Sequence, residues 1–233
     1  MVEKKILKVK DIDVLVYKKD IKNFHLNVLP PDGRVRVSVP KTVSDDIVRL
    51  LVIQKFHWIK KQIKIFQEQE RQTKREYVSG ESHYFKGQRY ILKVEKAKSP
   101  RIEIKNKKYI YFHVPEHYTF RQRENYYQNW LRKEFTKELE ILIPKWERLT
   151  GIKVKEVKVK KMKTKWGTCN PEAKRIWLNL ELIKKPTKCL EYVIVHELVH
   201  FLEKRHNKKF EAYMDKFMPK WRTYRRQLNE FIL

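Results

Sequence analysis

The segment Val193–His200 places two histidines and one glutamate in an apolar run, Val-Ile-Val-His-Glu-Leu-Val-His. Pro186 precedes this run, and the apolar residues predict a helix from Leu190 to about Glu203. Residues four apart share one face of a helix, so the imidazoles of His196 and His200 can bind the same metal ion. Unpaired imidazole and carboxylate groups in a buried helix are costly in free energy, so chance explains this pattern poorly.

The order histidine, glutamate, two further residues and histidine is typical of zinc hydrolases. Glu197 follows the first histidine and can take a proton from a water molecule at the open position of the metal. A catalytic zinc ion usually has three protein ligands. His206 lies six residues after His200, and a chain that turns back after the helix can bring it to the ion. The sequence therefore predicts a zinc site of His196, His200 and His206, with Glu197 as the catalytic residue.

Two other interpretations of this region stay open. Glu211 and Asp215, on the next predicted helix, are alternative candidates for the third ligand. His206 is then only a cap at the start of that helix.

The first half of the chain is predicted to be rich in strands. Residues 6–40 alternate apolar and polar side chains around the turn Pro30-Pro31-Asp32-Gly33, which indicates a small antiparallel sheet. Ser44 is expected to cap one long helix over about Asp45 to Arg71. A second run of short strands follows between His83 and Val114. These elements form the expected N-terminal part, residues 1–120.

The apolar positions of the predicted long helix indicate which face is buried. Ile47, Leu51, Trp58 and Ile65 recur at helical spacing, while the far side of the helix is polar and basic.

The second half begins with a helix predicted over Phe120 to Leu149, which Pro144 should kink or split. Ile152 to Lys165 alternates valines and lysines, which is typical of an exposed strand, and Arg175 to Leu180 is expected to form another. The helix with the two histidines comes next. Residues 121–233 are therefore the expected catalytic domain.

Composition limits the partners and the location of the protein. The formal net charge of +27 and the sequence pI of about 10.0 favour polyanions such as nucleic acids or nucleotides, although the lysines are spread along the whole chain. The N-terminal residues lack the apolar core of a signal peptide, and no stretch approaches the roughly 20 apolar residues of a membrane span. Cys169 and Cys189 form no zinc-binding pair. We expect a soluble, cytoplasmic protein with no membrane partner.

Nearly the whole sequence resembles the YgjP-like metallopeptidase family, relatives of the SprT-like zinc proteases. The residues that carry the resemblance are Pro31–Pro40, Met162, Trp166–Cys169, Leu178, Asn179, Tyr192–His200, His206, Phe210 and Trp221. The resemblance implies the same zinc ligands, His196, His200 and His206, and the same general base, Glu197. It implies an α+β fold, in which a β-rich N-terminal part precedes a zincin-like core that contains the HExxH helix.

The family motif W-G-S-C reads Trp166-Gly167-Thr168-Cys169 in this chain, and threonine keeps the hydroxyl group of serine. One interpretation is a strand edge that lines the site and pairs with an extended substrate. The other is a tight turn packed under the zinc helix. Cys169 is expected to be neither a ligand nor a nucleophile.

The predicted function is that of a zinc metallohydrolase, in first place a metallopeptidase acting on a peptide or protein substrate. A zinc-dependent nucleotide or phosphate-ester hydrolase and a DNA-associated SprT-like protease are the alternatives that the positive charge suggests. A binding module with a structural zinc ion would need a fourth ligand, and Glu197 would have no purpose in it.

Overall fold

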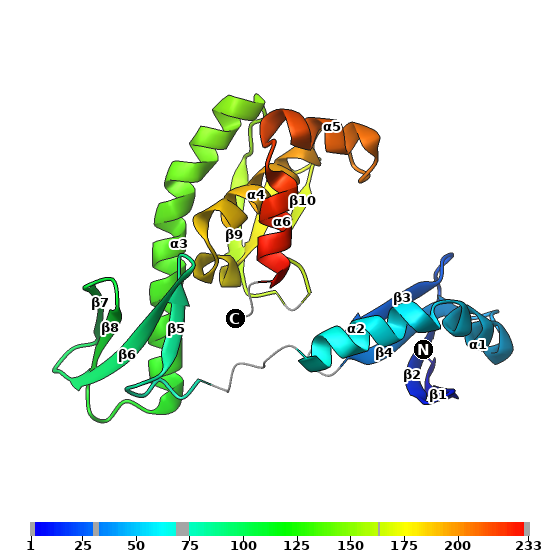
Figure 1. Cartoon of the computed structure of the whole chain (residues 1–233), viewed down its shortest axis with the longest axis horizontal. Helices are drawn as coiled ribbons and strands as arrows, with labels where there is room; N and C mark the ends of the chain where they lie inside the picture. The colour runs from blue at the N-terminus through cyan, green and yellow to red at the C-terminus, as the bar shows by residue number, and fades with distance from the viewer. Residues whose placement is uncertain (1–2, 30–32, 69–74, 163, 231–233) are drawn as a thin grey trace. The chain divides into compact units, whose positions relative to one another are not determined.

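The computed structural model describes residues 3–29, 33–68, 75–162 and 164–230 (Figure 1). Contacts divide the chain into two compact units, residues 1–71 and residues 72–233. Each unit combines strands and helices, so the expected α+β class agrees with the structure. Among the described residues, none of the helices combines the length and the apolarity that a membrane crossing requires.

The first unit contains a four-stranded sheet with the order β1-β2-β4-β3. Its strands are β1 (Glu3–Val9), β2 (Ile12–Lys19), β3 (His25–Leu29) and β4 (Arg34–Pro40). The expectation of a purely antiparallel sheet is wrong, because β4 inserts between β2 and β3 and runs parallel to β2. The alternating pattern is confirmed, since valines of β2 and β4 are fully buried. Most of the expected turn, residues 30–32, lies outside the described residues.

The long helix expected after Ser44 is two helices, α1 (Asp45–Gln54) and α2 (Phe56–Glu68). The Ser44 hydroxyl accepts a hydrogen bond from the Ile47 backbone, which confirms the cap. At Lys55 the backbone N–H bonds to the carbonyl groups of Val52 and Ile53, so the regular pattern is interrupted. Neither proline nor glycine marks this position, and the sequence pattern therefore gave no sign of the break. The expected end at Arg71 lies outside the described residues.

The buried face of these helices is displaced by one residue from the predicted one. Val48, Val52 and Ile59 are fully buried, whereas Ile47 and Trp58 are 48% and 44% exposed. Both sets have helical spacing, so periodicity alone did not distinguish them.

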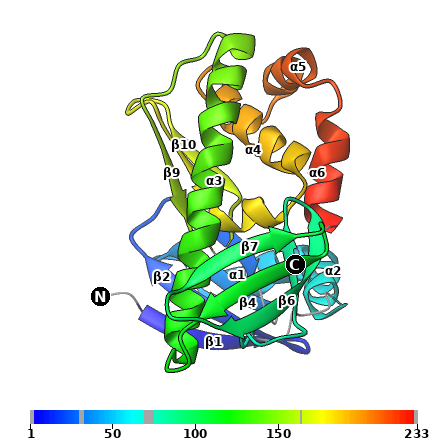
Figure 2. The ribbon, with the colours of Figure 1, turned by 90° about the vertical axis from the view of Figure 1, so that its left-hand side faces the viewer.

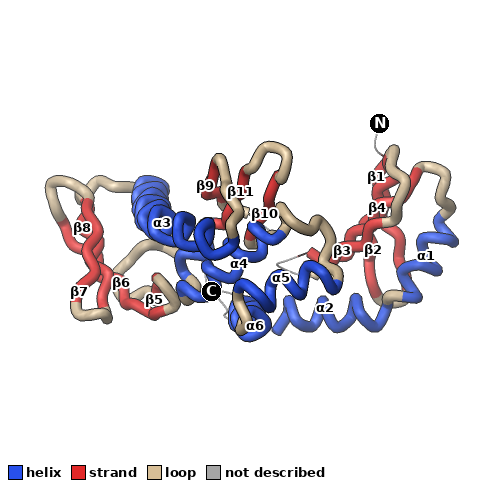
Figure 3. The backbone as a smooth tube through the Cα atoms, turned by 90° about the horizontal axis from the view of Figure 1, so that it is seen from above, coloured by secondary structure: helices blue, strands red, loops and turns tan. Residues whose placement is uncertain are grey.

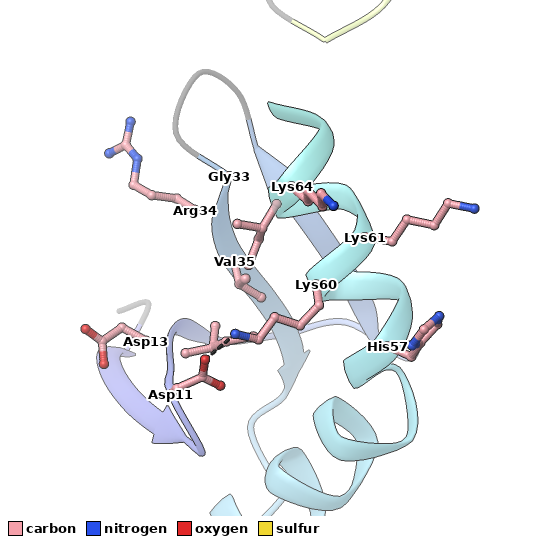
Figure 4. A pocket seen from close by; sticks show the side chains of 11 residues that line it. Asp11, Asp13, Gly33, Arg34, Val35, His57, Lys60, Lys61 and Lys64 are labelled. Carbon is pink, nitrogen blue, oxygen red and sulfur yellow. Dashed lines mark hydrogen bonds and ion pairs between the residues drawn. The ribbon is translucent and has the colours of Figure 1, made fainter. Parts of the chain in front are cut away.

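A cavity of about 800 Å³ in the first unit lies beside α2 and the start of β4. Lys60 forms an ion pair with Asp11, while His57 and Lys61 point away from that pair (Figure 4). The cavity therefore does not gather its ionisable groups around one point.

The second unit begins with a four-stranded sheet of order β5-β6-β8-β7. The strands are β5 (Ser82–Phe85), β6 (Gln88–Lys96), β7 (Arg101–Lys105) and β8 (Tyr109–Val114), as the alternation between His83 and Val114 predicted. One face of this sheet packs on the helix α3 (Phe120–Thr150), which lies behind it in Figure 2. Leu92, Ile110 and Phe112 share this core with side chains of α3.

Helix α3 is continuous over 31 residues, so Pro144 does not split it, while the alternative expectation of a kink stays a prediction. Pro144 and Glu140, whose carbonyl group loses its helical partner, both lie on the exposed side. Leu142 and Trp146 are buried on the opposite side and hold the last turns against the core. Water can reach the freed carbonyl group, and Gly151 ends the helix in a left-handed conformation.

The remaining elements build a small sheet and a group of helices on the other side of α3 (Figures 1 and 3). The strands are β9 (Glu156–Lys160), β10 (Gly167–Asn170) and β11 (Arg175–Asn179), in the order β10-β11-β9. A 3-10 helix (Leu180–Lys184) leads into α4 (Thr187–Val199), which is followed by α5 (Lys208–Phe217) and α6 (Trp221–Glu230). The helix predicted to run to about Glu203 ends at Val199, so His196 and Glu197 lie within α4 and His200 is its C-cap, and α4 buries ten of its residues.

The division expected near residue 120 does not coincide with the boundary between the compact units. The turn between β5 and β6 donates backbone hydrogen bonds from Lys86 and Gly87 to the carbonyl oxygens of Ile183 and Lys184, at 2.8 and 3.1 Å. The sheet of residues 82–114 is therefore joined to the segment that precedes α4.

Candidate metal centre

Three histidines meet where α4 ends. His196 lies in the last turn of α4, and His200 is its C-cap residue. The chain then turns back, and His206 precedes Asn207, the residue that caps α5. One ligand nitrogen from each histidine lies within 4.8 Å of the other two, and the Nε2 atoms of His196 and His206 are 3.0 Å apart. The structure thus brings together the three residues that the sequence predicted as ligands.

A ring and a backbone carbonyl support this cluster. The Phe210 ring lies 4.7 to 5.0 Å from the three imidazoles, measured between ring centroids. His200 Nδ1 is 3.1 Å from the carbonyl oxygen of Glu203. When Nδ1 donates its proton to this oxygen, the lone pair of His200 Nε2 is left for a ligand, as in many metal sites.

The chemistry of the donor set fits a metal ion. Burial, followed by the charges of His200 and His206, lowers the pKa of His196 to about 3, and burial also lowers the pKa of His200. Both imidazoles are therefore neutral at pH 7, which is the form that binds a metal. His196 Nδ1 is buried and has no hydrogen-bond partner among the described residues.

Glu197 lies on a different side of α4 from His196 and His200 and packs against β10. Its side chain is buried, with 5% of the residue exposed. A Cβ atom on Gly167 would lie 2.6 Å from Glu197 Oε1, so only glycine leaves room for the carboxylate at this point of β10. Burial raises the pKa of Glu197 to about 7, although the charge of Lys165 and a hydrogen bond with Cys169 oppose the increase.

The four residues of the Trp-Gly-Thr-Cys motif take different positions. Gly167 and Cys169 contact Glu197, while Thr168, between them, is exposed. The Trp166 ring lies 5.1 Å from the Lys185 ammonium group. The segment Gly167–Asn170 is an edge strand of the small sheet, not a turn. Burial and the Glu197 carboxylate raise the pKa of Cys169 to about 11, which agrees with the expectation that its thiol is no nucleophile.

Asn179 holds the segment that leads into β10. Its side-chain Nδ2 donates hydrogen bonds to the carbonyl oxygens of Met162 and Lys165, at 3.0 and 2.8 Å. Its backbone N–H donates a hydrogen bond to the carbonyl oxygen of Trp166 at 2.8 Å. Asn179 belongs to the family resemblance, but its sequence context predicts no role for it. This role depends on contacts 13 to 17 residues apart, which a local pattern does not contain.

The rival ligands Glu211 and Asp215 lie outside the cluster. Both carboxylates form ion pairs with Arg222, and Asp215 also accepts a hydrogen bond from the Trp221 indole at 2.8 Å. Tyr192, which belongs to the family resemblance but has no predicted role, lies one turn before His196 with the ring centroids 5.8 Å apart. Its spacing of four residues from His196 was the available signal.

A family model and a solved structure are similar to this chain. No curated protein matches the chain. A solved structure, the metallopeptidase zymogen of Pyrococcus abyssi abylysin, is similar over 39% of this chain and 90% of its own, with 17% identity and a TM-score of 0.36. The sequence model of the YgjP-like metallopeptidase domain matches residues 22–231. Since this match covers nearly the whole sequence, the chain belongs to the YgjP-like metallopeptidase family.

Proposed function

We propose that the protein is a zinc-dependent peptidase in which His196, His200 and His206 bind the metal ion and Glu197 is the general base. One observation carries the proposal: nitrogen atoms of three imidazoles lie within 4.8 Å of one another, and a buried carboxylate follows the first of them in sequence. Three nitrogen ligands are a usual set for catalytic zinc, whereas magnesium and calcium prefer oxygen ligands.

The residues of the chain divide the reaction between them. A zinc ion would polarise the scissile carbonyl group and lower the pKa of the attacking water. Glu197 takes a proton from that water on its carboxylate and returns it to the leaving amine. The Cys169 thiol shares a hydrogen bond with this carboxylate, and Gly167 allows it to approach β10. These two contacts fix the position of the base.

The substrate in this proposal is an extended peptide. β10 is an edge strand and pairs with β11 among the described residues. An edge strand offers backbone donors and acceptors to an added strand. Because β10 also contacts Glu197, a peptide paired with it would pass close to the general base.

The proposal includes a cytoplasmic location. Cys169 and Cys189 are both free thiols, as expected in a reducing compartment.

The experiment offers zinc-loaded protein three substrates: unfolded casein, nucleoside triphosphates and DNA with a covalently attached protein. Each is tested with and without a zinc chelator. We expect chelator-sensitive cleavage of casein. Hydrolysis of the triphosphates alone would replace the peptidase with a phosphate-ester hydrolase, which the charge of +27 also suits. Cleavage only of the DNA-attached protein would indicate a protease that needs nucleic acid.

A further inference from the structure

A cavity of about 440 Å³ lies between α5 and α6. Its lining consists of Glu211 on α5 and of Trp221, Arg222, Arg225, Arg226 and Asn229 on α6. The α6 residues are spaced by one, three, one and three positions, so they occupy one face of that helix.

The lining is positively charged. Three arginines and one glutamate give a formal charge of +2, from three positive charges minus one. Arg222 is already held by Asp215 and Glu211. Arg225 and Arg226 are exposed, and no ion pair joins either of them to a carboxylate of the described residues. Two guanidinium groups are therefore left for a ligand, and their planar donors suit the two oxygens of a carboxylate.

Aromatic contacts connect the α6 side of this cavity with the histidine cluster. The Trp221 ring stacks on the Tyr192 ring at 6.3 Å, with an angle of 7° between their planes, and the Tyr192 ring lies 5.8 Å from that of His196. On the α5 side, Glu211 follows Phe210, whose ring contacts all three histidines. The Tyr192 ring thus lies in contact with both the Trp221 ring of the cavity and the His196 imidazole of the cluster.

We propose that this cavity binds a carboxylate of the peptide substrate, with Arg225 and Arg226 as the residues that select for it. The inference rests on the proposed peptidase function and adds the substrate class, namely peptides that carry a negative charge near the cleaved bond. The carboxylate can be the C-terminus of the peptide or the side chain of an acidic residue. A C-terminal carboxylate ends the peptide, whereas the peptide chain continues on both sides of an acidic residue.

Binding is measured apart from cleavage, in the zinc-loaded Glu197→Gln protein, by fluorescence polarisation. The probes are labelled ten-residue peptides of alanine, glycine and leucine in three forms: amidated with a central asparagine, amidated with a central aspartate, and with a central asparagine and a free C-terminus. We expect at least one of the two charged forms to bind roughly tenfold more tightly than the neutral form, since charge-assisted hydrogen bonds contribute about 1.5 to 3 kcal/mol.

The double substitution Arg225→Gln, Arg226→Gln should remove this preference while zinc content and thermal unfolding stay unchanged. Arg132→Gln, Lys133→Gln is the matched control, because it removes two positive charges from exposed positions of α3. It should keep the preference. Glu211→Gln removes the acidic group of the lining and should strengthen binding of the charged form, which gives a test in the opposite direction.

The three peptides also identify the source of the carboxylate. Preference for the aspartate peptide assigns an acidic side chain, and preference for the free C-terminus assigns a terminal carboxylate. The inference is overturned if the charged and neutral peptides bind alike, if none of them binds, if the arginine variants keep the preference, or if the α3 control loses it equally. Casein cleavage without a charge preference would overturn this inference alone. The protein could also show the arginine-dependent preference and yet cleave no peptide. That result would support the carboxylate site and overturn the proposed peptidase function.

Discussion

Gly167 and Glu197 are packed so closely that a methyl group on the Gly167 α-carbon would lie 2.6 Å from the carboxylate oxygen Oε1. The same methyl group would lie 2.9 Å from Cγ and 3.0 Å from Cδ of Glu197. Carbon atoms in proteins do not approach one another this closely. The position of the proposed general base therefore depends on the absence of a side chain at residue 167.

Gly167→Ala should reduce hydrolysis by at least roughly 100-fold, because Glu197 must move and a displacement of about 1 Å costs that much. Zinc content should stay the same, since the three atoms nearest to the added methyl group belong to Glu197 and not to the three histidines. Steady-state kinetics and elemental analysis measure the two effects. Thr168→Ala, which changes an exposed residue of the same strand, should have a smaller effect on kcat. Full activity of Gly167→Ala would show that the base does not need its observed position.

His83 gives the stability of the second unit a dependence on pH. Its side chain is buried beside Tyr77 and Tyr127, and burial lowers its pKa from 6.5 to about 4, against the opposing hydrogen bond with Glu81. Between these two pH values the unfolded chain binds a proton that the folded chain does not. The free energy of unfolding should therefore decrease as the pH falls from 6.5 to 4, by about 3 kcal/mol in total.

Urea unfolding at pH 7.0, 5.5 and 4.5 measures this effect in the parent and in His83→Gln. The variant should lose less stability over the interval than the parent does. Groups remote from residue 83, including the zinc ligands, titrate alike in both proteins, so the difference reports on His83 together with its partner Glu81. Parallel loss of stability in the two proteins would show that His83 is protonated in the folded state.

The histidine cluster was predictable because its information is local. His196 and His200 are four residues apart on an apolar helix, and His206 follows after one bend. The buried residues Tyr127, Leu131 and Phe135 of α3 likewise follow one helical period, which is local information. The contact of Gly167 with Glu197 was not predicted, because it joins two elements 30 residues apart.

The errors have the same physical origin. The break at Lys55 and the choice between Ile47 and Val48 as the buried residue depend on the sheet that the helices cover, and not on the helix sequence alone. The parallel pairing of β2 with β4 arises because β4 inserts next to β2, which a strand pattern does not specify.

The identity of the third ligand can be tested by substitution. His206→Ala should weaken zinc binding by more than roughly 100-fold, because two imidazoles bind zinc much less tightly than three. Glu211→Ala should change the affinity by no more than about 100-fold, as for a residue outside the ligand shell. Its carboxylate pairs with Arg222 and lies outside the histidine cluster. Competition with a chromogenic chelator measures both affinities. The reverse order would replace His206 with Glu211 in the site.

The most direct test of the account compares zinc content and hydrolysis in Glu197→Gln. The amide has nearly the shape of the carboxylate and leaves His196, His200 and His206 unchanged, but it cannot accept a proton from water. We expect about one zinc ion per chain in both proteins. The kcat for casein should be lower in the variant by a factor of about 100 to 10,000. A variant that keeps its zinc and most of its activity would contradict the assignment of Glu197 as the general base, and an active parent protein without zinc would contradict the metal site itself.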